Sequence, residues 1–188
     1  MKKLALSLAF AAFTSSAFAA PETFNIDTTH TAPRFEYNHF GYSNQIHSFD
    51  QSSGQVVYDP VAHTGSVDIS IDAKSVNTGY ALLNQHIQDA DFFDTAKYPT
   101  ITFKSTKVKF DGAKPVAVEG NLTIKGVTKP VTLTVTSFQM MPNPMLKRDA
   151  IGANVVTKIK RSEFNMGKYA PMVSDDVTLS IAMEAIKQ

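Results

Sequence analysis

The stretch "VEGNLTIKGVTKPVTLTV", Val118 to Val135, decides the fold of this 188-residue chain. On both sides of its central segment "KGVTKP", apolar side chains recur at every second position, and Val116 upstream shares the parity of Val118. That period of two is typical of half-buried β-strands. Within the central segment, Gly126 supplies a flexible turn, and Pro130 cannot donate a hydrogen bond to a strand ladder. The sequence therefore predicts a β-hairpin here.

The same period of two recurs along most of the chain. Apolar residues alternate with Ser and Asp from Val67 to Ile71, and with polar or small residues from Val177 to Met183. Between Ile101 and Phe110 the parity of the apolar positions changes, as an inserted residue would cause. We therefore expect a β-bulge near Ser105 to Lys107.

One segment departs from the strand pattern. From Tyr80 to Asp91 the apolar positions follow helical spacing, which predicts a short amphipathic helix with this stripe: Leu82, Leu83, His86, Ile87 and Ala90. About six to nine strands joined by turns indicate an all-β fold, an antiparallel barrel or sandwich. A closed barrel is favoured because closure removes exposed strand edges.

The N-terminus has the three parts of a secretory signal peptide. These are the charged start Met1 to Lys3, the apolar run Leu4 to Phe13 and the small-residue site Ala17 to Ala19. We expect cleavage near Ala19 and export of one soluble domain, residues 20–188, to the periplasm or the exterior. The apolar run is shorter than the roughly 18 residues of a membrane helix, and no later run reaches that length. The chain has no Cys, which excludes disulfides and thiol chemistry.

The charge balance argues against a nucleic-acid partner. Lys2 and Lys3 leave with the signal peptide, so the mature chain carries 16 basic and 17 acidic side chains. Phosphate neutralisation needs a clustered basic surface instead. In the most basic stretch, Lys158 and Lys160 share a parity opposite to Ile159, which favours a solvated strand face over a phosphate site.

Three carboxylates, Asp89, Asp91 and Asp94, lie close together in the stretch "QHIQDADFFDTAKYPTITF". An acid/base pair needs one carboxyl group in a dry environment that raises its pKa, and nothing in the sequence indicates one. We interpret these acids as a polar wrapping around Phe92 and Phe93, which turn inward. With no GxSxG, GxGxxG or P-loop motif in the sequence, the chain is not predicted to be an enzyme.

The histidines allow two hypotheses. His30, His39 and His47 would form a hydrolytic metal site only if the barrel strands brought them together, and no HExxH motif is present. Alternatively, a neutral imidazole at His30 or His39 can hydrogen-bond the polar head of a lipid or quinone. We assign no metal ligand, no catalytic residue and no cofactor other than a bound lipid.

Aromatic residues indicate a binding cavity. In "RFEYNHFGY", Phe35, Tyr37 and His39 share one strand face, with Phe40 and Tyr42 beyond them. Such a stripe fills an ordinary core in most proteins. An eight-stranded barrel, however, is either filled by side chains or left open for one small ligand. This chain has no Trp, many small or medium candidates for the interior (Val118, Gly120, Val135, Ala153), and adaptable methionines (Met140, Met141, Met145, Met166), so a partly empty tube is expected.

Four blocks of the sequence resemble the YceI-like family of secreted bacterial proteins. They are "FNIDTTHTAPRFEYNHFG", "HIQDADFFDTAKYPTITFKST", "VEGNLTIKGVTKPVTLTV" and "IKRSEFNMGKYAPMVSDDVTLSIAMEA". The resemblance implies a lipocalin-like antiparallel β-barrel of about eight strands around an apolar cavity, with the short helix beside its opening. Strand parity and these blocks together give the expected cavity residues: Phe35, Tyr37, His39, Phe40, Phe92, Phe93, Phe103, Phe164 and Met166.

The expected function is binding and transport of one amphiphilic molecule with a long isoprenoid or acyl tail. The resemblance implies a polyprenyl lipid, an isoprenoid quinone or a fatty amide as ligand. Transient membrane contact and a homodimer remain open, and no integral membrane segment is expected. Two alternatives are a metal-dependent or other hydrolase and a structural or stress-related envelope protein without ligand.

Overall fold

The hairpin predicted from Val118 to Val135 is present, with a tighter turn than the sequence suggested. In the computed structural model, which describes residues 20–188, β8 (Lys114–Ile124) is joined to β9 (Val127–Pro142) by Lys125 and Gly126 alone. Both turn residues have positive φ, 49° and 73°, as the favoured two-residue hairpin turns require. Pro130 therefore lies within β9, opposite Asn121, rather than in the turn.

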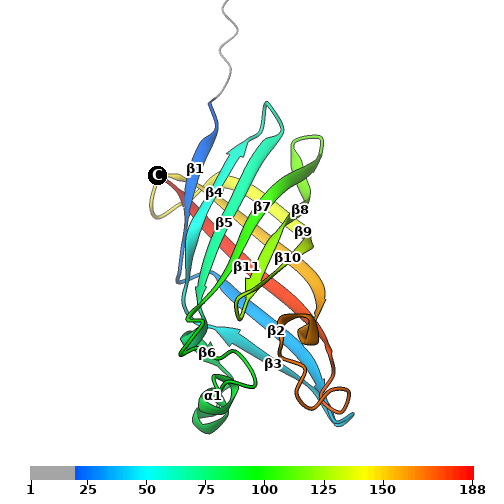
Figure 1. Ribbon diagram of the computed structural model, residues 1–188. Helices are drawn as coiled ribbons and strands as arrows, with labels where there is room; N and C mark the ends of the chain where they lie inside the picture. The colour runs from blue at the N-terminus through cyan, green and yellow to red at the C-terminus, as the bar shows by residue number, and fades with distance from the viewer. Residues whose placement is uncertain (1–19) are drawn as a thin grey trace, which may run out of the picture.

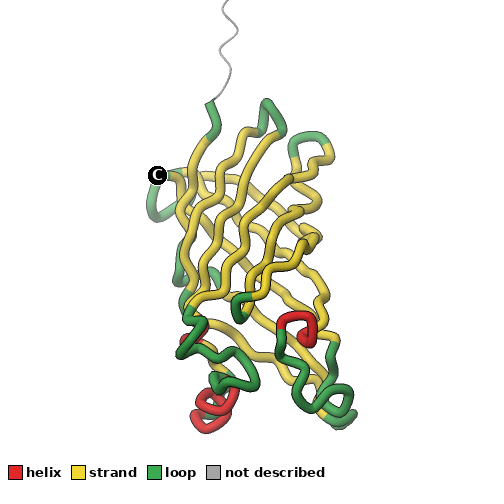
Figure 2. Tube along the Cα trace, viewed as in Figure 1, coloured by secondary structure: helices red, strands yellow, loops and turns green. Residues whose placement is uncertain are grey.

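The described residues form eleven strands in one antiparallel sheet, and eight of them close a barrel (Figures 1 and 2). Around the ring the order is β1, β4, β5, β7, β8, β9, β10 and β11, and pairing of β1 with β11 closes it. The bounds of the other strands are β1 (Glu22–Ile26), β2 (Ala32–His39), β3 (Ser43–Phe49), β4 (Ser52–Asp59), β5 (Thr64–Asp72), β6 (Val76–Asn77), β7 (Thr100–Asp111), β10 (Asp149–Lys160) and β11 (Asp176–Lys187). The lipocalin-like barrel expected from the sequence is confirmed.

Strands β2, β3 and β6 extend the wall of the barrel beyond the ring. The C-terminal end of β11 pairs with β1, whereas residues 178–182 of the same strand pair with β2. Between β1 and β2 the chain turns at Asp27, whose carboxylate accepts hydrogen bonds from the Thr29 N–H at 2.9 Å and the Thr29 hydroxyl at 2.6 Å. His30 Nδ1 lies 2.8 Å from the other carboxylate oxygen. These hydrogen bonds lower the pKa of Asp27 to about 2.

The β-bulge predicted near Ser105 to Lys107 is confirmed. The pairing of β7 with β8 shifts between these two residues. Because the shift reverses the parity of β7, both Phe103 before the bulge and Val108 after it face the interior of the barrel.

A second irregularity in the same pair of strands was not predicted. Lys109 pairs with Ala117, but the next residue, Phe110, pairs with Pro115. Val116 is thus an extra residue and is 41% exposed, although its parity in the sequence had grouped it with Val118.

The predicted helix exists but is shorter than Tyr80 to Asp91. Helix α1 (Ala81–Ile87) lies at one end of the barrel, called here the α1 end (Figure 1). Ile87 is buried, whereas Leu82 is 63% exposed, so only part of the predicted apolar stripe packs against the barrel. The chain then runs through turns to β7. Two short 3-10 helices, Ala73–Ser75 and Arg161–Phe164, follow β5 and β10.

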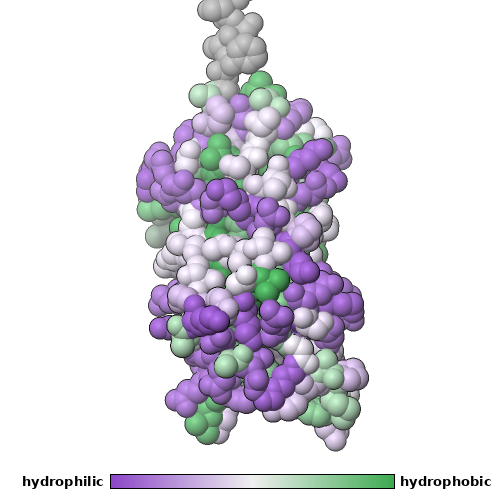
Figure 3. Space-filling model, in the orientation of Figure 1, coloured by the Kyte–Doolittle hydropathy of each residue, from purple (hydrophilic) through white to green (hydrophobic). Residues whose placement is uncertain are grey.

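The outer face of the barrel is largely polar, as Figure 3 shows for one side. The buried apolar side chains form two clusters, the larger of which extends from the barrel interior to Val76 of β6 and Ile87 of α1. Among the described residues, no helix is long and apolar enough to cross a membrane. The predicted signal peptide, residues 1–19, lies outside the described residues.

Candidate functional site

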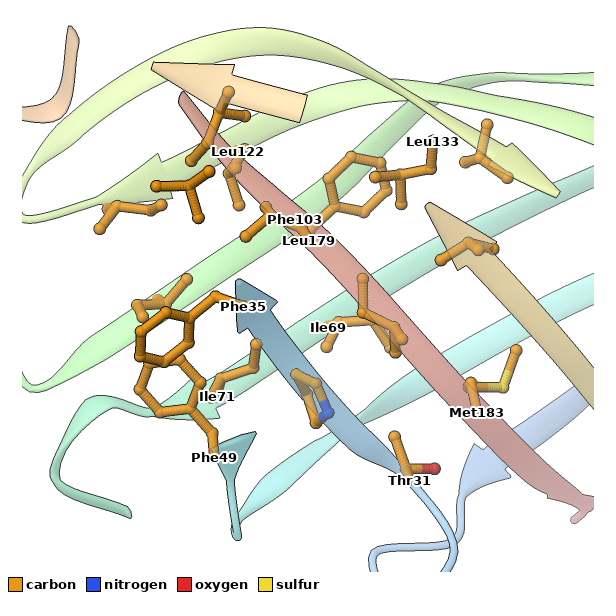
Figure 4. A pocket seen from close by; sticks show the side chains of 18 of the residues that line it. Thr31, Phe35, Phe49, Ile69, Ile71, Phe103, Leu122, Leu133, Leu179 and Met183 are labelled. Atoms are coloured by element: carbon orange, nitrogen blue, oxygen red, sulfur yellow. The ribbon is translucent and has the colours of Figure 1, made fainter. Parts of the chain in front are cut away.

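The barrel encloses one large apolar cavity with a volume of about 410 Å³. Side chains from most strands of the ring reach it, including Phe103 from β7, Leu133 from β9 and Leu179 from β11 (Figure 4). A volume of this size falls within the range of roughly 300–1,000 Å³ found for small-molecule sites. The barrel therefore has room for one ligand and does not fill its own interior.

Several inward side chains remain partly accessible because they face this hollow. Leu133, Val135 and Leu179 line the cavity, yet each is only half-buried. Their apolar neighbours inside the barrel do not cover them completely. Contact area on these side chains is thus left for a guest molecule.

The structure places eight of the nine expected cavity residues on the cavity wall. They are Phe35, Tyr37, His39, Phe40, Phe92, Phe93, Phe103 and Met166. Contact of these side chains with a ligand remains a prediction. The Phe103 ring lies directly over the backbone of Gly120, where an added Cβ would sit 2.5 Å from the ring carbon Cζ.

Phe164 and three of the four methionines named from the sequence do not line the cavity. Phe164 belongs to the 3-10 helix after β10, is 1% exposed and packs into the core without lining the cavity. Met141 and Met145 are 55% and 88% exposed, and Met140 is half-buried against the second apolar cluster. Met183 of β11 lines the cavity in their place.

Aromatic rings narrow the end of the cavity opposite to α1. Tyr58 packs against Phe110 and Phe138, with ring centroids 6.2 and 5.3 Å apart. The Tyr58 hydroxyl donates to the Ala113 carbonyl at 2.6 Å, which fixes the ring beside the β7–β8 turn. These three rings form the wall of the cavity at this end.

The α1 end holds the accessible part of the wall. Of the cavity residues there, Phe40 is 42% and Tyr169 is 51% exposed. The Phe92 ring, which follows α1, lies 6.2 Å from that of Tyr169. Lys125 Nζ connects the segment after α1 to the segment after β10 by donating to the carbonyls of Ala90 and Asn165, at 2.6 and 2.8 Å. We therefore place the mouth of the cavity at the α1 end.

Two buried polar groups lie near this mouth. The Tyr37 hydroxyl lies 3.1 Å from His47 Nε2, and burial raises the pKa of Tyr37 and lowers that of His47, which favours the neutral imidazole. Arg161 follows Ile159 with the same inward parity, lines the cavity and is only 7% exposed. The sequence contained a signal for Arg161, since its parity is opposite to that of Lys158 and Lys160.

The three clustered aspartates do not form a buried acid/base pair. Asp91 makes an exposed ion pair with Lys168, whose hydrogen bond lowers the pKa of Asp91. Asp89 lies 3.5 Å from His86 and is exposed, while Asp94 has a positive φ of 49° in the turn before β7. The interpretation of these acids as polar wrapping fits this arrangement, because Phe93 beside them is buried.

The described residues also contain one group with the composition of a metal site. Ligand atoms of Asp27, His30 and Glu184 lie within 4.8 Å of one another. His30 is exposed, and its contact with Asp27 belongs to the turn between β1 and β2. Neither His39 nor His47 belongs to this group.

A closed eight-stranded barrel around a single apolar cavity defines the class of small β-barrel binding proteins to which the lipocalins belong. The family match is more specific: the YceI-like domain matches residues 24–185, and the chain belongs to the YceI-like family. It is 36% identical to protein YceI of Escherichia coli O157:H7 over 194 residues, which cover all of both chains.

Solved structures agree with this assignment. The crystal structure of Burkholderia cenocepacia BcnA is 29% identical, with a TM-score of 0.73 over 85% of this chain and 99% of that one. A polyisoprenoid binding domain from Saccharophagus degradans, implicated in plant cell wall breakdown, has a TM-score of 0.64. That domain is 21% identical and covers 88% of this chain and 98% of its own, a likeness that concerns the fold.

Proposed function

We propose that this protein is an exported carrier that holds one amphiphilic molecule with a long isoprenoid or acyl tail inside the barrel. The observation that supports this most directly is the apolar cavity of about 410 Å³ with its mouth at the α1 end. The polyprenyl lipids, isoprenoid quinones and fatty amides expected from the sequence all have such a tail. The neighbour from Saccharophagus degradans, described as polyisoprenoid binding, supports the same class of ligand.

Partitioning supplies the driving force. Removing apolar surface from water gains roughly 25 cal/mol per Å², so burial of about 300 Å² of tail gives a gross gain of about 7.5 kcal/mol. Immobilising the ligand offsets part of that gain. The proposed export, with loss of residues 1–19, would place the carrier where it meets lipids of the cell envelope.

The first test is identification of the resident molecule. Protein isolated from its native host without detergent is expected to carry one amphiphile per chain, because an apolar cavity in water favours a guest. Native mass spectrometry would show the adduct, and mass spectrometry of an organic extract would identify it. An empty cavity in the isolated protein, together with failure to bind any long-chain lipid added later, would favour the ligand-free envelope protein.

Apolar side chains surround the mouth, and we infer that they contact a lipid bilayer during exchange of the ligand. Three of them form what we call the apolar rim: Tyr42, Leu82 and Met172, which are 88%, 63% and 61% exposed. Phe40 N–H donates to the Met172 carbonyl at 2.9 Å, so the rim adjoins the cavity wall. The proposed guest comes from a membrane, and aromatic and aliphatic side chains at an interface are suited to insertion between head groups.

Replacing the three rim residues by Ser is expected to slow transfer of a lipid from vesicles at least about tenfold, because less apolar area enters the interface. Equilibrium affinity should not change, since none of the three lines the cavity. The matched control replaces Met141, Met145 and Leu146, exposed apolar residues at the opposite end, and should transfer lipid like the wild type. Equal transfer by both triple variants, or a dimer that buries the rim, would contradict membrane contact.

A further inference from the structure

We propose that the cavity selects ligands with an acidic head group, a carboxylate or a phosphate monoester, and that Arg161 receives this group at the mouth. The proposal rests on the proposed carrier function and specifies which amphiphiles it accepts. It starts from a charge that the fold buries without a direct ion-pair partner.

The Arg161 guanidinium is held by backbone carbonyls only. Nε donates to the Ser174 carbonyl at 2.8 Å, Nη2 to that of Val173 at 2.7 Å, and Nη1 to those of Met166 and Lys168, the latter at 2.8 Å. These bonds fix the loop between the 3-10 helix and β11 and satisfy four of the five N–H groups. The second N–H of Nη2 has no partner among the described residues.

Among residues 20–188, no carboxylate lies within ion-pair distance of Arg161. Asp175 is adjacent, but its carboxylate accepts hydrogen bonds from the N–H of Ser162 at 2.8 Å and from its hydroxyl at 2.7 Å. Arginine keeps its charge even when buried. The fold therefore holds a buried guanidinium, 7% exposed, on the wall of an apolar cavity, with Asp175 nearby but no carboxylate in direct contact.

The surroundings of Arg161 favour a bound anion over a neutral head group. Around the cavity the other lining side chains are almost all apolar, so an anion beside the guanidinium is weakly screened by water. Tyr37 also lines the wall there, and its hydroxyl hydrogen is free to donate when His47 donates from Nε2. An acidic head near Arg161 leaves the tail to occupy the barrel toward Phe103 and Leu133.

The test compares head groups on one tail, which avoids variants that disturb the loop. Oleate, oleamide and oleyl alcohol share the same chain, as do geranylgeranyl phosphate and geranylgeraniol. The affinity of each lipid would be measured by its displacement of a neutral fluorescent dye from wild-type protein at pH 8. Every lipid is kept below the concentration at which it aggregates. We expect oleate and geranylgeranyl phosphate to bind at least about tenfold more tightly than their neutral partners, as charge-assisted hydrogen bonds allow.

A repeat in 0.5 M salt separates Arg161 from surface lysines, because salt screens exposed charges far more than buried ones. A preference that persists supports the proposal, and one that disappears in salt overturns it. In the Tyr37→Phe variant, the preference for the acidic head group should fall about threefold, while the affinity for oleyl alcohol should change little. Equal affinity for all head groups would overturn the proposal for Arg161, whose role would then be to hold the loop, but it would be consistent with the carrier function. If none of these lipids bound, the carrier function itself would be rejected.

Discussion

The Leu133→Asp variant is expected to bind its lipid at least about 100-fold more weakly than the wild type, while folding normally. Leu133 lines the cavity but is only half-buried, so in the empty protein an Asp at this position keeps water around its carboxylate. Entry of a hydrocarbon tail removes that water, and desolvating an unpaired carboxylate costs several kcal/mol unless it protonates. A loss of about 3 kcal/mol corresponds to the expected change in affinity.

Thr134→Asp is the matched control, because Thr134 is the next residue of β9 and is exposed on the outer face. It adds the same charge a few ångströms away, outside the barrel, and should bind lipid like the wild type. Displacement titrations and the lipid content of the purified proteins measure the difference, after a cooperative melt has shown that both variants are folded. A folded Leu133→Asp protein with wild-type affinity would place the ligand outside the cavity.

Much of the barrel could be predicted because strand parity is a local property. The hairpin around Gly126 and the bulge at Ser105 to Lys107 follow from which apolar residues share a face, and both are present. Val116 was misplaced because the second register shift depends on how Phe110 meets Pro115 across the strands. The C-terminal end of α1 was missed for a similar reason: the Phe93 N–H bonds back to the Ile87 carbonyl at 3.1 Å, so turns replace further helix.

The sequence predicted the site residues that lie on strands, but it misplaced one that lies in a 3-10 helix. Phe35 and Tyr37 lie on the inner face that their spacing indicates. Phe164 follows the end of β10 in a 3-10 helix, where a period of two no longer applies, and it packs into the core. The contacts that narrow the far end, such as Tyr58 with Phe138, join strands that are distant in the sequence, so no local pattern indicates them.

Gly54→Ala is expected to destabilise the barrel strongly, although it adds only one methyl group. Gly54 lies in β4 opposite Ile69 of β5, with φ at +138°, a conformation that L residues rarely adopt. An added Cβ would sit 2.1 Å from the Asp68 carbonyl oxygen, a backbone atom that cannot move without opening the pairing of β4 with β5. Backbone strain and overlap each cost about 1–3 kcal/mol, so we expect a loss of at least about 3 kcal/mol.

For a chain of this length such a loss lowers the melting temperature by roughly 10 °C. Gly152→Ala, in β10, is the matched control: no heavy atom lies within 4 Å of its added Cβ, so its stability should equal or slightly exceed that of the wild type. Thermal and urea unfolding of the two variants, both freed of lipid, measure the difference. If Gly54→Ala has the same melting temperature as Gly152→Ala, β4 tolerates a side chain at this position and the closed ring does not depend on this glycine.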